Sequence, residues 1–139
     1  MKLSCIALVA FCGLSASVAD AATWVKAIDS KTSRIFVDTS SINRTGGIVA
    51  AWYRRDFNHP MPAEKKAQLY KSSKVLNYYN CSDHEVAPAQ WITYENRDGL
   101  GKIISNEKVV ALEYGEVPSG EAGAAVFDFV CHYAKSRRT

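Results

Sequence analysis

The segment from Val117 to Ala134 constrains the fold most, because it is the one stretch of the chain whose apolar residues repeat at helical spacing. The residues that follow the i, i+3, i+4, i+7 pattern of an amphipathic helix are Ala124, Phe127, Val130, Cys131 and Ala134. Ser119 stands before this segment and is the expected N-cap. A bond made by Cys131 would fix the helix to the rest of the molecule.

The first 21 residues have the pattern of a secretory signal peptide. Lys2 supplies a positive charge, an apolar run extends from Leu3 to Leu14, and Ala19 and Ala21 are the small residues of a cleavage site. We expect cleavage after Ala21, which leaves residues 22–139 as one exported domain. The apolar run is shorter than the about 20 residues of a transmembrane helix, so no transmembrane segment is predicted.

Cleavage of the leader changes the cysteine content of the chain. Cys5 and Cys12 are removed with it, and Cys81 and Cys131 remain in a protein exported to an oxidising compartment. We therefore predict a Cys81–Cys131 disulfide, which would stabilise the fold by roughly 4 kcal/mol by closing a loop of about 50 residues. Lipidation of Cys12 is not expected, because Phe11 stands where lipoprotein processing requires a small residue.

Between the leader and the helix, strand-like runs alternate with turns. The runs expected as strands are Thr23–Asp29, Arg34–Asp38, Ile48–Phe57, Lys71–Cys81, Val86–Asn96 and Gly101–Asn106. Asn58 to Leu69 is expected to be a loop, because Pro60 and Pro62 each lack a backbone donor. Pro88 indicates the start of a strand or an edge position. These elements predict an α+β domain with an antiparallel sheet of about six strands.

The chain offers little sign of catalysis or nucleic-acid binding. With 17 Lys and Arg against 14 Asp and Glu, its charge is too weak to predict a nucleic-acid partner. Nucleophile-elbow, zinc-protease and phosphate-loop motifs are absent from the sequence, so no catalytic residue and no cofactor are predicted. Cys81, His84, Cys131 and His132 are possible metal ligands, but neighbouring helical positions point about 100° apart, so no metal site is predicted.

A basic region that contains tyrosines is the predicted protein-binding surface. It consists of Lys65, Lys66, Tyr70, Lys71, Lys74 and Tyr78. Tyrosine is favoured at interfaces, and lysines at their rim attract acidic partners. A charged strand edge that resists aggregation explains the same lysines equally well. Arg54 and Arg55 are consecutive in a strand, so at most one of them joins any single patch.

The order of the elements resembles that of the surface-adhesin protein E family of exported bacterial proteins. The fragments that carry the resemblance are Trp24-Val25, Phe36-Val37-Asp38, Ser41-Ile42, Val49-Ala50-Ala51-Trp52, Tyr79-Asn80-Cys81, Gly99 to Gly101 and Phe129-Val130-Cys131. The resemblance implies a C-terminal helix tied by the disulfide to the concave face of the sheet, and a tendency to form homodimers. It also implies adhesion to host extracellular-matrix or plasma proteins.

These observations predict an exported, non-enzymatic protein-binding module, located in the periplasm or at the cell surface. A periplasmic domain with a bacterial partner or a structural role is the alternative function. An enzyme of unknown class comes third, since Asp83 and Glu85 flank His84 and could support proton transfer.

Overall fold

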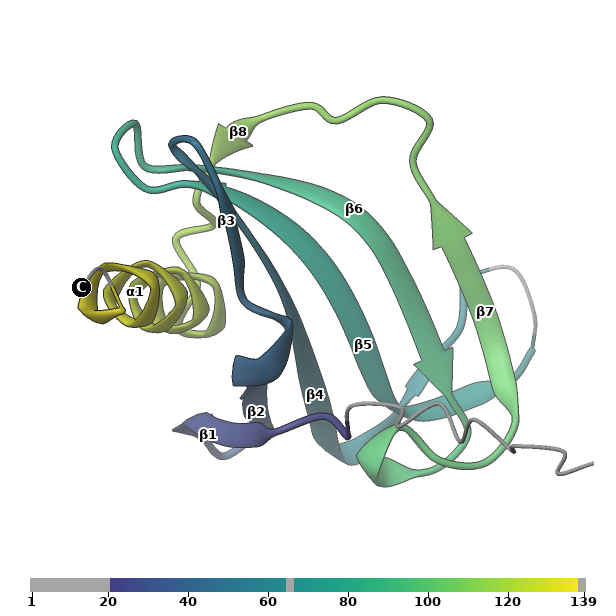
Figure 1. Cartoon of the computed structure of the whole chain (residues 1–139). Coiled ribbons are helices and arrows are strands. Elements are labelled where there is room, and N and C mark those ends of the chain that lie inside the picture. The colour runs from purple at the N-terminus through teal and green to yellow at the C-terminus, as the bar shows by residue number, and fades with distance from the viewer. Residues whose placement is uncertain (1–20, 65–66, 138–139) are drawn as a thin grey trace, which may run out of the picture.

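The computed structural model describes residues 21–64 and 67–137, in which a curved antiparallel sheet carries one α-helix (Figure 1). The strands are β1 Trp24–Asp29, β2 Ser33–Asp38, β3 Asn43–Thr45, β4 Ile48–Pro62, β5 Leu69–Asn80, β6 Glu85–Tyr94, β7 Ile103–Lys108 and β8 Gly115–Glu116. The main strand order is β1-β2-β4-β5-β6-β7, with β3 added beside β4 and β8 beside β6. The predicted antiparallel α+β fold is confirmed. The predicted leader lies outside the described residues, except for Ala21.

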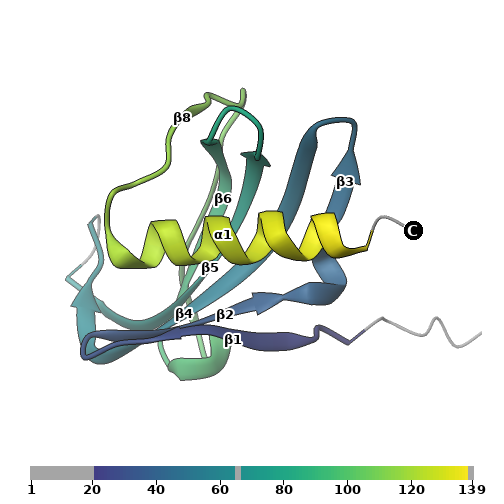
Figure 2. The ribbon, with the colours of Figure 1, turned by 90° about the vertical axis from the view of Figure 1, so that its left-hand side faces the viewer.

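The helix α1, Glu121–Ser136, lies across one face of the sheet (Figure 2). Val126, Phe127, Val130 and Ala134 are buried, and they form one core with Ile35, Val37, Val49, Ala51, Tyr79 and Val86 of the sheet. Phe127 and Val130, two of the apolar positions of the predicted amphipathic helix, thus lie in the core. Ala124 is exposed, so its assignment to the buried stripe was wrong.

The start of α1 differs from the sequence-based prediction. The N-cap is Gly120, not Ser119, and no side chain forms a capping hydrogen bond there. Gly123 approaches Pro118 closely: a Cβ atom at position 123 would lie 2.9 Å from the Pro118 carbonyl oxygen. This close approach lets the segment before α1 fold back over the first turn of the helix.

A disulfide joins Cys81, which directly follows β5, to Cys131 in α1, as predicted, with a Cα–Cα distance of 5.8 Å. Val75, Asn77 and Tyr79, which alternate along β5, face the helix near this bond. The ring of Tyr79 packs edge-on against that of Phe127, with 6.0 Å between the centroids. The disulfide therefore closes the core at the end where β5 and α1 meet.

The predicted loop from Asn58 to Leu69 is wrong in part, because β4 continues to Pro62 and β5 begins at Leu69. Strand β2 pairs with β4 as far as Phe57, and the Asn58 N–H still donates to the Thr32 carbonyl at 3.0 Å. Beyond Asn58, that side of β4 needs no ladder donor. The pairing of β4 with β5 also shifts register between Asp56 and Met61. Prolines are tolerated in a strand at such irregular and edge positions.

Pro88 lies inside β6, a strand with partners on both sides, and not at its start. It is accommodated because β8 pairs with β6 at Glu85 and Val86, whereas β7 pairs with β6 from Gln90 onward. The pairing with β5 also shifts register here, between Leu76 and Asn77. Pro88 therefore occupies a local edge within an interior strand.

Two tyrosines on the face under α1, the buried Tyr79 and the half-buried Tyr53, predict an alkaline loss of stability. Burial raises the pKa of the Tyr79 and Tyr53 phenols above the ordinary 10.0. The folded state therefore favours the protonated phenols, and its stability is retained below pH 10 and falls as the pH rises further. We expect a loss of up to about 1.4 kcal/mol per pH unit for each tyrosine.

Urea denaturation at increasing pH measures this slope. Tyr79→Phe should reduce the slope of the unfolding free energy against pH by the contribution of about one proton. Tyr114→Phe, at an exposed tyrosine, should leave this slope unchanged. An unfolding free energy that stays constant above pH 10 would contradict the assignment.

Candidate protein-binding surface

The sheet has one face covered by α1 and one face free of it. In the register of β2, β4 and β5, Phe36, Arg54 and Lys74 lie side by side. The next row contains Tyr53 and Val75, which line a cavity together with Val126 of α1. Since successive strand residues point to opposite faces, the row with Lys74 lies on the helix-free face.

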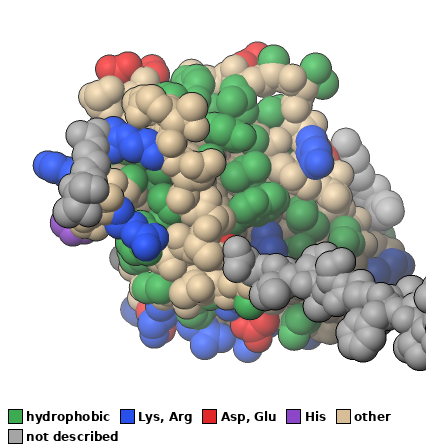
Figure 3. Space-filling model, in the orientation of Figure 1, with side chains coloured by type: hydrophobic (Ala, Val, Ile, Leu, Met, Phe, Trp, Pro, Cys, Tyr) green, Lys and Arg blue, Asp and Glu red, His purple; other side chains and the backbone are tan. Residues whose placement is uncertain are grey.

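Lys74 and Tyr78 of the predicted surface share the helix-free face of β5. The Lys74 ammonium lies 5.6 Å from the ring centroid of Trp24 and 5.3 Å from that of Tyr94. Trp52 and Leu76 pair across β4 and β5 on the same face and are half-buried, as is Tyr78. In space-filling form, hydrophobic side chains gather in a band over β5 and β6 (Figure 3).

The other predicted surface residues lie in different surroundings. The ring of Tyr70 packs edge-on against Phe57, 5.6 Å between centroids, and lines a separate cavity with Trp91. Lys71 is exposed and lines a cleft with Pro60. Lys65 and Lys66 lie outside the described residues. The structure thus places Lys74 and Tyr78 on one face of β5, with Leu76 between them, and gives Tyr70 and Lys71 different surroundings.

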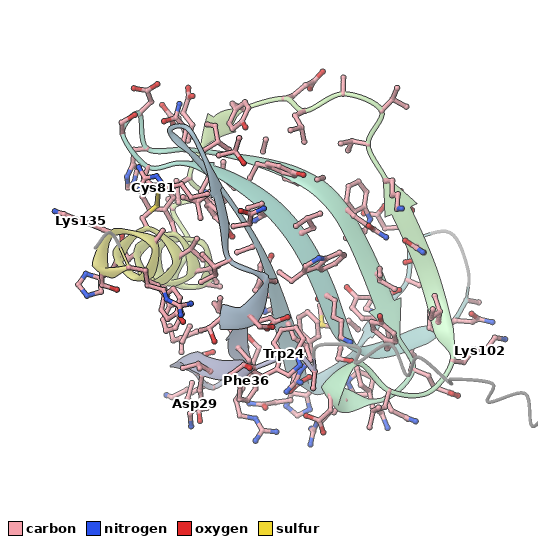
Figure 4. All side chains as sticks on the ribbon, viewed as in Figure 1. Trp24, Asp29, Phe36, Cys81, Lys102 and Lys135 are labelled. Atoms are coloured by element: carbon pink, nitrogen blue, oxygen red, sulfur yellow. A yellow bond between two sulfur atoms is a disulfide. The ribbon has the colours of Figure 1, made fainter. Side chains whose placement is uncertain are left out.

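A cluster of charged and aromatic residues beside Lys74 was not predicted from the sequence. Arg54 is buried, and its guanidinium lies 5.1 Å from the ring centroid of Trp24 and 4.6 Å from that of Phe36. Arg54 Nη2 forms ion pairs with Asp56 Oδ2 at 3.1 Å and with Asp98 Oδ1 at 3.0 Å. Trp24 and Phe36 lie together at the lower end of the sheet (Figure 4). We call Trp24, Phe36, Arg54, Asp56, Lys74 and Asp98 the Arg54 cluster.

The Arg54 cluster holds the turn between β6 and β7 on the sheet. The turn contains the 3-10 helix η2, Arg97–Gly99, and the backbone N–H of Asp98 donates to Asp56 Oδ1 at 3.0 Å. The N–H of Gly99 donates to the buried Ser72 hydroxyl at 3.0 Å. Gly99 has a φ of 67°, and an added Cβ atom would lie 2.5 Å from Lys74 Cε. The turn at Asp98-Gly99 is therefore fixed by side chains of β4 and β5.

One sequence signal could have identified this cluster. Arg54 and Asp56 are two residues apart in a strand, so both side chains point to one face, where opposite charges can pair. The third member, Asp98, is more than forty positions away along the chain. Only the path of the β6–β7 turn brings it there.

The residues considered as metal ligands or proton-transfer groups make contacts that are typical of structural residues. Among the described residues, no group of three or more His, Cys, Asp and Glu side chains is arranged to hold a metal ion. The His84 ring packs 4.3 Å from that of Phe127, and the Asp83 carboxylate accepts a hydrogen bond from Asn80 Nδ2 at 2.8 Å. Within the described chain, no helix is long and apolar enough to span a membrane.

Comparison with known proteins gives a consistent family and fold. The family model described as "Surface-adhesin protein E" matches residues 24–132, a span that contains the whole sheet, most of α1 and both cysteines of the disulfide. No curated protein matches the sequence.

Solved structures of protein E have the same fold. The crystal structure of protein E from non-typeable Haemophilus influenzae superposes with a TM-score of 0.57 at 14% sequence identity, covering 81% of this chain and 78% of that one. Crystal form II of Haemophilus influenzae protein E gives a TM-score of 0.52 at 12% identity, covering 72% and 82%. At such low identity, the likeness establishes the fold but not the binding residues.

Proposed function

Since the chain belongs to the surface-adhesin protein E family, we propose that it is an exported, non-enzymatic module that binds host extracellular-matrix or plasma proteins. The family match over residues 24–132 is the observation that carries this proposal. It is supported by a fold in which a disulfide and a buried core fix the sheet. Such a scaffold suits binding by a preformed surface.

The proposed contact surface comprises Lys65, Lys66, Tyr70, Lys71, Lys74 and Tyr78, as the sequence predicted. Lys74 and Tyr78 form its centre on the helix-free face, next to the half-buried Trp52 and Leu76. Aromatic side chains of this kind dominate interface energetics, and a basic rim attracts acidic partners. Lys71 contributes to that rim, because its side chain is exposed.

A charge-matched pair of variants tests this surface. Replacing Lys65, Lys66, Lys71 and Lys74 by Gln should weaken binding to the responding matrix or plasma protein by about tenfold, because four steering charges are lost. Replacing Lys26, Lys31, Lys108 and Lys135 by Gln changes the net charge equally and should have little effect. Biolayer interferometry against a panel of immobilised matrix and plasma proteins measures both variants.

Two results would contradict the proposal in different ways. If the two Gln variants bound with equal affinity, the contact surface would not be the one proposed on and near β5. If the wild-type protein bound none of the proteins of the panel, the proposed adhesin function would be wrong.

The sequence before Cys12 favours a second candidate function, a periplasmic domain with a bacterial partner or a structural role. Phe11 argues against lipid attachment, and a protein without an anchor can stay between the two membranes. Cell fractionation distinguishes the candidates, since retention inside the outer membrane would exclude host contact. Light scattering of the purified protein tests the homodimer that the family resemblance implies.

A further inference from the structure

A cavity of about 490 Å³ lies between the first half of α1 and the covered face of the sheet. Its volume falls within the range of about 300–1,000 Å³ that is typical of small-molecule sites. Its walls are mainly aliphatic and come from the sheet, the linker before α1 and α1 itself: Ile35, Val75, Val86, Val117, Ala122 and Val126. This lining favours a ligand with an aliphatic body.

A cationic side chain lies at one end of the cavity. Arg55 Nε donates to the Ser33 hydroxyl at 2.8 Å, and its guanidinium lies 4.9 Å from the ring centroid of Phe57. Among the side chains that the structure describes, Arg55 forms no ion pair with a carboxylate. The neighbouring Arg54, by contrast, pairs with two aspartates on the opposite face. The Arg55 guanidinium can therefore form an ion pair with an anionic group of a ligand.

The side-chain amide of Asn77, which lacks one hydrogen-bond partner, lies towards the other end of the cavity. Asn77 Nδ2 donates to the Tyr79 hydroxyl at 3.1 Å, while the buried Oδ1 has no hydrogen-bond partner among the described residues. Turning the amide over would let the oxygen accept from Tyr79 and leave the amino group unpaired instead. A hydroxyl group can donate or accept, so it satisfies Asn77 in either orientation.

The register of the strands gives the spacing of these two positions along the sheet. Arg55 pairs with Ser73, and Asn77 follows Ser73 by four residues on β5. Four residues of an extended strand span about 13 Å. Val75 lies between the two ends and lines the cavity. An extended aliphatic chain of about ten carbons has a comparable length.

We propose that this cavity binds a medium-chain aliphatic carboxylic acid, with its carboxylate at Arg55, its chain against Val75 and Val126, and a terminal hydroxyl at Asn77. The Arg55 guanidinium provides a charge-assisted hydrogen bond, which discriminates strongly for the anion. The hydroxyl adds a weaker preference, because it removes the penalty of a buried amide atom without a partner. Lys74 and Tyr78 of the proposed protein-binding surface lie on the opposite face of the sheet, so ligand binding in the cavity can be tested separately from protein binding.

Isothermal titration calorimetry of the disulfide-bonded protein with decanoate, decanol and ω-hydroxydecanoate tests the proposal. Decanoate should bind about tenfold more tightly than decanol, because decanol cannot pair with Arg55. The ω-hydroxy acid should bind more tightly than decanoate. These ratios are measured on the wild-type protein, so they do not depend on the folding of a variant.

Variants then assign the two ends of the site. Arg55→Gln should remove the preference for the carboxylate, and Arg55→Lys should retain most of it. Arg44→Gln is the matched control, because Arg44 is an exposed arginine of β3 away from the cavity. Asn77→Leu should make decanoate and ω-hydroxydecanoate bind equally.

Three results would overturn the proposal. The first is the absence of saturable binding of either acid up to millimolar concentration. The second is equal binding of decanoate and decanol to the wild type. The third is an equal loss of decanoate affinity in Arg55→Gln and Arg44→Gln, which would indicate a general effect of charge.

Discussion

Replacing Cys81 and Cys131 together by serine is expected to lower the free energy of unfolding by about 4 kcal/mol. The bond spans 50 residues, and breaking it gives the unfolded chain the conformational entropy of that open loop. For a domain of this size, the midpoint of thermal unfolding should fall on the order of 15 °C. The loss should concern stability more than binding, because the disulfide lies beside the core and not on the proposed contact surface.

Thermal and urea unfolding of the oxidised wild type, the reduced wild type and the double-serine variant measure this effect. Reduction should bring the wild type to the stability of the variant, since both lack the same constraint. The single variant Cys131→Ser should behave like the double variant in reducing conditions. Equal melting temperatures for Cys131→Ser and wild type in oxidising conditions would contradict a stabilising disulfide.

The elements that could be predicted from the sequence are those with a strong local pattern. Period-two runs identified β1, β2 and β5 within two residues of their ends, and helical spacing identified α1. The predicted leader contains two of the four cysteines, which made Cys81–Cys131 the simplest pairing. In each case a property of a single segment, or of the predicted compartment, was sufficient for the prediction.

The errors concern properties that depend on a neighbouring strand. Pro60 lies in a strand and not in the expected loop, because β2 no longer pairs with β4 there, and the local sequence does not contain this information. The surroundings of the predicted surface residues also depend on neighbouring strands. Tyr70 and Lys74 are four residues apart on one strand, yet Tyr70 packs on Phe57 and Lys74 packs on Trp24 and Tyr94.

Arg54 and Arg55 show how alternation along one strand separates two roles. The prediction that they occupy different faces is confirmed by their contacts. Arg54 is neutralised in a buried cluster that joins β1, β4 and the β6–β7 turn. Arg55 is held by Ser33 at the wall of a cavity and retains an unpaired charge within the described chain. The first arginine therefore stabilises the fold, and the second is available to a ligand.

Asp56→Ala, in the buried part of the Arg54 cluster, is expected to lower the free energy of unfolding by about 3–5 kcal/mol. This is the second large effect. The side chain of Asp56 is only 1% exposed, and its oxygens accept both the Arg54 guanidinium and the Asp98 N–H. Its removal leaves the buried Arg54 with a single partner, Asp98, whose side chain is 63% exposed. Solvent screens that remaining pair, so it cannot offset the cost of a buried charge.

Two further variants separate the cost of an unpaired charge from the value of the pair itself. Asp98→Asn keeps a residue that tolerates the φ of 62° at this position and should cost less than about 1 kcal/mol. Arg54→Met combined with Asp56→Leu removes both buried charges, so it should be more stable than Asp56→Ala alone. Urea unfolding of all three variants provides the comparison. If Asp56→Ala and Asp98→Asn destabilised the protein equally, burial would not decide the strength of these ion pairs, and the Arg54 cluster would act as a surface salt bridge.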